Sequence, residues 1–154
     1  KSYFLANTSI RSFHGMSQGT MEMNNTHNFG PCPCESGLVY AGCCSELHSG
    51  RESAETALQL MRSRYSAFAL GITDYLVESW HPDTRPANLT IDESQRWIGL
   101  KIKTVSLGGA GEEEGSVEFV ARFKVKGKAH RLHENSRFQR VGGRWYYLGG
   151  ERSG

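Results

Sequence analysis

Four cysteines lie within thirteen positions of this 154-residue sequence, at Cys32, Cys34, Cys43 and Cys44. Cysteine side chains bind metals as thiolates, form disulfides or exchange them. The pattern is C-x-C-x8-C-C, which lacks the C-x-x-C arrangement of thioredoxin-like redox sites. Adjacent residues such as Cys43 and Cys44 pair only through a small strained ring, so local disulfides are unfavourable. Cross pairs such as Cys32 with Cys43 stay open as an alternative to a metal.

A tetrahedral metal site satisfies all four sulfur atoms at once. Two prolines stiffen the first pair and two glycines let the loop fold back, at Pro31, Pro33, Gly37 and Gly42. We expect the metal to be zinc, with Fe(II) as the alternative because it also accepts four thiolates. Four cysteine ligands leave no coordination position for a substrate or water. The site is therefore predicted to be structural rather than catalytic.

The stretches "PCPCESG" and "YAGCC" resemble the SEC-C motif. The resemblance implies that the four cysteines are the ligands and that Glu35 stands where glycine is usual. Some versions of the motif end in histidine, so His48 is a candidate for a substitute ligand or for a hydrogen-bond donor to a ligand. The other interpretation is a surface histidine without a role at the metal. In the tail of the bacterial preprotein translocase motor this motif contacts a chaperone and the ribosome. A protein partner of that kind is what the resemblance implies.

Two helices are predicted after the cysteines. From Thr56 to Leu70, apolar residues recur at helical spacing, and Gly71 ends the segment. A shorter helix is expected from Asp74 to Trp80, with Thr73 as its N-cap.

The apolar period then changes from 3.6 to 2, which indicates strands. The first has Ile98, Leu100 and Ile102 on its buried side, and the second covers 117–125. Lys126-Gly127 is a turn candidate, and further strands are expected over 130–140 and 144–148. Helices followed by an antiparallel meander predict an α+β fold with helices packed on one face of a curved sheet.

The stretches "LMRSRYSAFALG", "YLVESWHP", "RLHENSRF" and "WYYLGG" resemble the YchJ-like family of bacterial proteins. That family joins an N-terminal SEC-C knuckle to a nuclear-transport-factor-2-like cone, and its members are largely uncharacterised. The resemblance implies a knuckle over 30–50 and a cone domain over 51–154. Residues 1–29, poor in charge and rich in Asn, Ser and Thr, are expected to be a disordered tail or sequence foreign to the mature protein.

Polar residues interrupt the apolar faces of the predicted cone. Arg64 lies on the apolar face of the first helix, and Glu134 and His130 share the strand face of Leu132. Buried charges are costly unless paired, so Arg64 is predicted to meet Glu134, with Arg62 as the alternative partner. Such a pair either fixes helix against sheet or anchors a ligand in a pocket that Tyr65 and Trp80 line.

The leading functional hypothesis is a metal-binding adaptor whose cone takes a protein or a small ligand. An isomerase or hydro-lyase with Glu134 or His130 as its base is the alternative, and no nucleophile motif or phosphate loop supports it. The net charge of +2 gives no case for nucleic-acid binding. No apolar run reaches the length of a membrane span or a signal peptide, so a cytoplasmic protein is expected.

Overall fold

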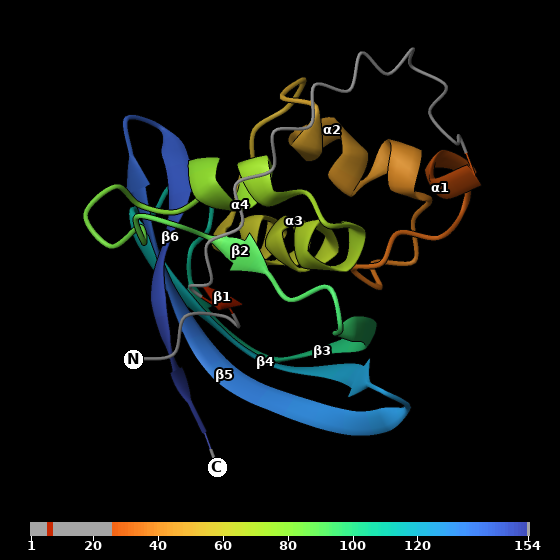
Figure 1. Cartoon of the computed structure of the whole chain (residues 1–154). Coiled ribbons are helices and arrows are strands. Elements are labelled where there is room, and N and C mark those ends of the chain that lie inside the picture. Colours follow the sequence, from red (N-terminus) through yellow and green to blue (C-terminus); the bar gives the residue numbers. More distant parts are fainter. Residues whose placement is uncertain (1–5, 8–25, 154) are drawn as a thin grey trace.

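The computed structural model describes residues 6–7 and 26–153 (Figure 1). Most of the predicted tail, residues 1–29, lies outside the described residues. Its described parts form β1 (Ala6–Asn7) and α1 (Thr26–Phe29), and β1 pairs antiparallel with β2 (Thr90–Ile91). None of the described helices is both long and apolar enough to cross a membrane.

The cysteine segment contains two short elements, the 3-10 helix η1 (Tyr40–Gly42) and α2 (Cys44–His48). The main helix, α3 (Ala57–Leu70), follows. Its predicted end is confirmed, because Gly71 adopts the left-handed conformation, with φ of 74°. Thr56, the predicted first residue, is instead the N-cap and accepts a hydrogen bond from the Gln59 amide.

The next helix, α4, covers Thr73–Glu78 and starts one residue earlier than predicted. Thr73 is its first helical residue rather than its N-cap. Ile72 holds the cap position, without a side-chain hydrogen bond. Trp80 therefore lies beyond the helix, where it forms an isolated parallel bridge with Tyr147.

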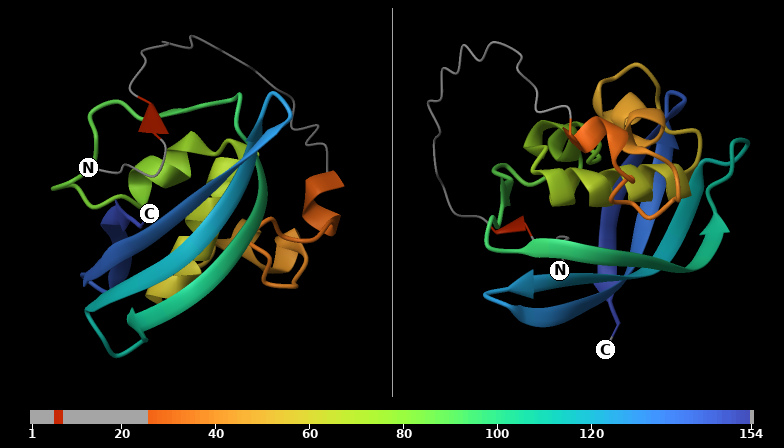
Figure 2. Two further views of the ribbon diagram at one scale, coloured as in Figure 1. Left: turned by 90° about the horizontal axis from the view of Figure 1, so that it is seen from below. Right: turned by 90° about the vertical axis from the view of Figure 1, so that its right-hand side faces the viewer.

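Four long strands form one antiparallel sheet in the order β3-β4-β5-β6. Their bounds are β3 Arg96–Leu107, β4 Glu114–Val125, β5 Lys128–Val141 and β6 Arg144–Arg152. The sheet curves, and α3 and α4 lie on one of its faces (Figure 2). This confirms the predicted α+β cone, although the strands extend further than the short apolar patterns indicated.

One predicted core residue is misplaced. Ile98 is 44% exposed, because the pairing of β3 with β4 skips it between Trp97 and Gly99. This bulge shifts the side-chain alternation by one position. Trp97 packs against the core instead, while Leu100 faces inward as expected.

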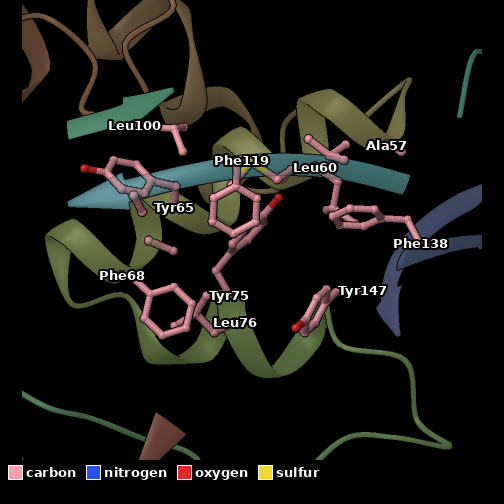
Figure 3. Close-up of a cluster of buried hydrophobic side chains, with 14 of the residues drawn as sticks. Ala57, Leu60, Tyr65, Phe68, Tyr75, Leu76, Leu100, Phe119, Phe138 and Tyr147 are labelled. Carbon is pink, nitrogen blue, oxygen red and sulfur yellow. The ribbon is translucent and has the colours of Figure 1, made fainter. Parts of the chain in front are cut away.

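The core lies between α3, α4 and the sheet (Figure 3). Phe119 of β4 lies in the middle of the cluster, with Tyr65 and Phe68 of α3 to one side of it and Tyr147 of β6 to the other. The second, smaller cluster joins the cysteines to Tyr40 and Leu70. Because Leu70 belongs to α3, that helix packs against both the cone and the cysteine segment.

Candidate metal centre

The four cysteine sulfurs converge as predicted. All lie within 4.8 Å of one another, and none is in a disulfide. The Sγ atom of Cys43 is 3.6 Å from that of Cys34 and 4.0 Å from that of Cys44. These separations are well beyond the ~2.05 Å of a sulfur–sulfur bond. The group can hold a metal ion, and the cross-paired disulfides are not formed here.

Backbone hydrogen bonds bring the two cysteine pairs together. The amide of Cys32 donates to the Leu38 carbonyl at 2.9 Å, and the amide of Tyr40 donates to the Gly30 carbonyl at 2.9 Å. This short antiparallel pairing folds the loop back on itself. Cys43 then stands between η1 and α2, and Cys44 is the first residue of α2. We call the segment from Gly30 to His48 the knuckle.

Two serine hydroxyls lie against the sulfurs. The Oγ atom of Ser36 is 3.2 Å from the sulfur of Cys43. The Oγ atom of Ser66, on α3, is 3.3 Å from the sulfur of Cys44 and 3.5 Å from that of Cys32. The cone helix therefore supplies a polar group to the cysteine cluster.

The thiols differ in how readily they ionise. Hydrogen bonds from the thiols of Cys32 and Cys44 hold the pKa of Cys34 far below its usual value. The pKa of Cys44 is raised, first by its hydrogen bonds to Cys32 and Cys34 and then by burial, and burial raises that of Cys43. The surroundings thus favour the thiolate of Cys34 and oppose those of Cys43 and Cys44, which a bound cation would stabilise.

His48 is neither a ligand nor a surface histidine. Its Nε2–H donates to the Ser63 carbonyl at 2.8 Å, which leaves Nδ1 to accept from the Tyr40 hydroxyl at 2.7 Å. Burial lowers the pKa of His48 and raises that of Tyr40 to about 12. The imidazole is therefore neutral and joins the knuckle to α3.

Glu35 attaches the knuckle to the sheet. Its backbone adopts φ of 59°, the conformation that explains why glycine is usual at this position of the motif. Its Oε2 atom accepts a hydrogen bond of 2.6 Å from the amide of Leu100 on β3. The carboxylate thus holds the edge of the sheet, a contact that no pattern in the sequence indicated.

The predicted ion pair between Arg64 and Glu134 is not formed in the described part of the chain. Arg64 is buried, and its Nη1 donates to the Leu76 carbonyl at 2.8 Å and to Ser79 Oγ at 2.6 Å. The last carbonyls of a helix lack partners within it, so the end of α4 offers acceptors to Arg64. Burial lowers the pKa of Arg64 to about 10, which leaves it charged at neutral pH.

Aromatic rings complete the surroundings of Arg64. Its guanidinium carbon lies 4.4 Å from the centre of the Tyr147 ring and 5.1 Å from that of Trp80. Trp80 therefore lies beside Arg64 in the interior, as predicted. Tyr65 points elsewhere, with its ring edge toward Trp97.

The other residues predicted to line a pocket with Arg64 lie apart from it. Glu134 is fully buried and accepts a hydrogen bond from Ser136 at 2.9 Å. His130 has the strand parity that was predicted but lies next to the β4–β5 turn, where it is exposed and stacks on Phe123. Arg62, the alternative partner of Glu134, donates instead to the Cys34 carbonyl at 2.5 Å.

A cavity of about 10 Å³ lies beside Arg64, lined by Met61, Arg64, Phe119, Ser136, Phe138 and Tyr147. Such a volume admits about one water molecule. At this position the interior is packed around Arg64 rather than open to a ligand.

The sequence carried one overlooked signal for the contact between the knuckle and the cone. Ser63 and Ser66 lie three residues apart on α3, opposite the apolar face. Both are buried, because the knuckle covers them. Small residues at helical spacing on the second face of a central helix indicate a second packing surface.

The fold and the site define a nuclear-transport-factor-2-like cone that carries a four-cysteine knuckle. The family model described as the YchJ middle NTF2-like domain matches residues 56–150. The chain therefore belongs to the YchJ-like family.

Known relatives agree with this assignment. A UPF0225 protein of Chromobacterium violaceum is 53% identical over 122 residues, which cover 77% of this chain and 90% of the relative. One from Streptomyces coelicolor is 46% identical, covering 79% and 94%.

Two solved structures resemble the fold. The solution structure of a SEC-C motif containing protein from Rhodopseudomonas palustris has a TM-score of 0.70 and 36% identity, and the match covers 80% of this chain and 98% of that one. The crystal structure of another SEC-C motif containing protein, from Psychrobacter arcticus, has a TM-score of 0.68 and 28% identity, with 83% and 85% covered.

Proposed function

We propose that the protein is a zinc-binding adaptor whose knuckle presents a surface to a protein partner in the cytoplasm. The convergence of four sulfurs carries this proposal. Ligands at ~2.3 Å from a tetrahedral zinc lie about 3.8 Å apart, and the separations of 3.6 and 4.0 Å fall on either side of that value. Cys32, Cys34, Cys43 and Cys44 would hold the ion, which would fix the loop without taking part in chemistry.

The surface that the knuckle presents is apolar. Phe29 is 78% exposed, Leu38 is 56% exposed and Val39 is 52% exposed. The bridge between Pro31 and Val39 holds the loop that carries Leu38 and Val39 next to the start of the knuckle, and Phe29 ends α1 just before that start. Exposed large apolar side chains grouped on a rigid loop favour protein binding. We call Phe29, Leu38 and Val39 the apolar tip.

The metal is tested first. Protein purified under reducing conditions without chelator should contain one zinc ion per chain by elemental analysis, and Cys34→Ser should lose it. If the protein instead contains one iron ion per chain, the metal is Fe(II) rather than zinc. If it contains no stoichiometric metal, the proposal is refuted.

Partner binding is tested with purified ribosomes, the partner that the motif's translocase setting suggests. Wild-type protein should co-sediment, whereas the double variant Leu38→Ser with Val39→Ser should remain in the supernatant. The matched control is Val105→Ser with Leu107→Ser, which removes two exposed apolar side chains from β3 and should still co-sediment. A chaperone replaces the ribosome in a parallel assay, and failure with both would leave the adaptor role without a partner of this kind.

The alternative, an isomerase or hydro-lyase in the cone, has less support. A general base must face space that a substrate can enter. Glu134 is fully buried against Ser136, and His130 faces solvent near the β4–β5 turn.

A further inference from the structure

The sheet has an outer face that is turned away from α3 and α4 (Figure 2). This face carries a group of cations. Lys101 of β3 pairs in register with Val120 of β4, and Arg122 of β4 pairs with Arg131 of β5. Because side chains alternate between the faces of a sheet, these residues lie on the face opposite the core. Lys103 adds a fourth cation on β3.

A hollow of about 370 Å³ lies on this face. The four cations line it, together with Val120 and Ile98, and Glu35 reaches it from the knuckle. Val120 is only 4% exposed, although it lies on the outer face. The hollow therefore has an apolar floor and a basic wall, which we call the basic hollow.

The described residues offset only part of the positive charge of the basic hollow. Of its lining residues, only Glu35 is acidic, and its Oε2 atom accepts from the Leu100 amide. The nearby carboxylate of Glu118 accepts from His133 at 2.9 Å and from Thr104 at 3.0 Å. Within the described part of the chain, no salt bridge involves any of the four cations.

The arrangement also opposes folding. Arg122 and Arg131 stand directly opposite each other on adjacent strands. Like charges in that position destabilise a sheet, by up to about 1 kcal/mol. An anion bound between them would remove this repulsion. The pair therefore lowers the stability of the free protein and favours the binding of an anion.

The composition of the hollow indicates the class of ligand. No aromatic ring is among its lining residues, so it has no platform on which nucleic-acid bases could stack. Val120 and the exposed Ile98 suit an apolar side chain, which a phosphate backbone does not offer.

We propose that the basic hollow binds an acidic segment of a partner protein, in which carboxylates flank an apolar side chain. The carboxylates meet the lysines and arginines, and the apolar side chain covers Val120. This site is separate from the apolar tip and does not depend on what the tip binds.

The test is fluorescence anisotropy with a labelled peptide, Glu-Glu-Leu-Glu-Glu, at low salt. The wild type should bind it, more weakly as salt is added. The double variant Arg122→Glu with Arg131→Glu should bind at least about tenfold more weakly. The matched control, Lys126→Glu with Lys128→Glu, makes the same charge change at the exposed β4–β5 turn and should lose less than about threefold.

Three results would overturn the proposal: no binding by the wild type, equal losses in both double variants, or tighter binding of an oligothymidylate of equal charge. The last would assign the face to nucleic acid. Circular dichroism and thermal unfolding of each variant confirm that the fold is kept. The variant Leu38→Ser with Val39→Ser should bind the peptide normally, which separates this site from the adaptor proposal.

Discussion

The two faces of α3 hold two groups of polar side chains that are built differently. On one face, Ser66 lies against sulfurs that converge from within a single loop. On the other, Arg64 binds the end of α4 and two aromatic rings, while Glu134 is engaged elsewhere. Local residues build the first group, whereas the second is set by how distant elements pack.

The comparison shows where chemistry is available. The knuckle brings together donor atoms that remain free to bind a cation. Around Arg64, Nη1 donates its hydrogen bonds and two rings cover the guanidinium, whereas Nη2 is buried without a hydrogen-bond partner among the described residues. The adjoining cavity is about 10 Å³. The knuckle thus offers four convergent donor atoms to a cation, whereas the space beside Arg64 admits no ligand larger than about one water molecule.

Removing the metal should have the largest effect, and it should be confined to one region. Structural zinc sites contribute ~10 to 16 kcal/mol in small peptides. Chelation should therefore speed hydrogen exchange at the Cys32 and Tyr40 amides, which hold the knuckle, while the Phe119 amide in β4 stays protected. Equal loss of protection in both regions would show that the cone also depends on the metal. If the knuckle amides lost no protection, the knuckle would not depend on the metal.

A double-mutant cycle tests the contacts of Arg64. Hydrogen bonds to charged groups contribute about 1.5–3 kcal/mol, so Arg64→Met and Ser79→Ala should couple by about 1–2 kcal/mol in denaturant unfolding. Arg64→Met and Glu134→Gln should couple by less than about 0.5 kcal/mol. A larger coupling in the second cycle would restore the ion pair that the sequence predicted.

These two groups also show what could be predicted from sequence. Cys32 and Cys44 are twelve positions apart, and prolines and glycines in their loop restrict it enough for spacing to predict that the sulfurs converge. Helical and strand periodicity likewise predicted α3 and the meander. Arg64 and Glu134 were each correctly predicted to be buried.

The partners of Arg64 were not predictable, because periodicity gives the face of a residue but not what lies opposite it. Whether Arg64 reaches β5 or α4 depends on the path of the chain beyond Gly71. The bulge at Ile98 was not predictable either. One residue skipped in the strand pairing turns the following side chains to the opposite face of the sheet, and the apolar pattern of the sequence does not reveal it.

Glu35 provides a smaller test of how the two regions are joined. Glu35→Ala removes the hydrogen bond to Leu100 and keeps a non-glycine residue at positive φ, so it should destabilise the protein by about 1 kcal/mol. Glu35→Gly loses the same bond but relieves the left-handed backbone, and should cost less than half as much. Both should speed exchange of the Leu100 amide. Equal stability losses would mean that backbone strain at this position is negligible.

The smallest effect expected is a pH dependence at His48. Because burial lowers its pKa in the folded state, the unfolded chain binds more protons as the pH falls below about 6.5. Stability should therefore decrease with falling pH, by at most about 1.4 kcal/mol per unit, until the folded-state pKa is reached.

Denaturant unfolding of the wild type and His48→Gln across that range measures the difference, and proton effects at the cysteines cancel in it. Tyr40→Phe sharpens the result. Its hydroxyl donates to Nδ1 and so favours the neutral imidazole, which means that removing it should shrink the pH dependence without abolishing it. If His48→Gln retained the full wild-type slope, the titrating group would lie elsewhere, and the neutral tie between the knuckle and α3 would be refuted.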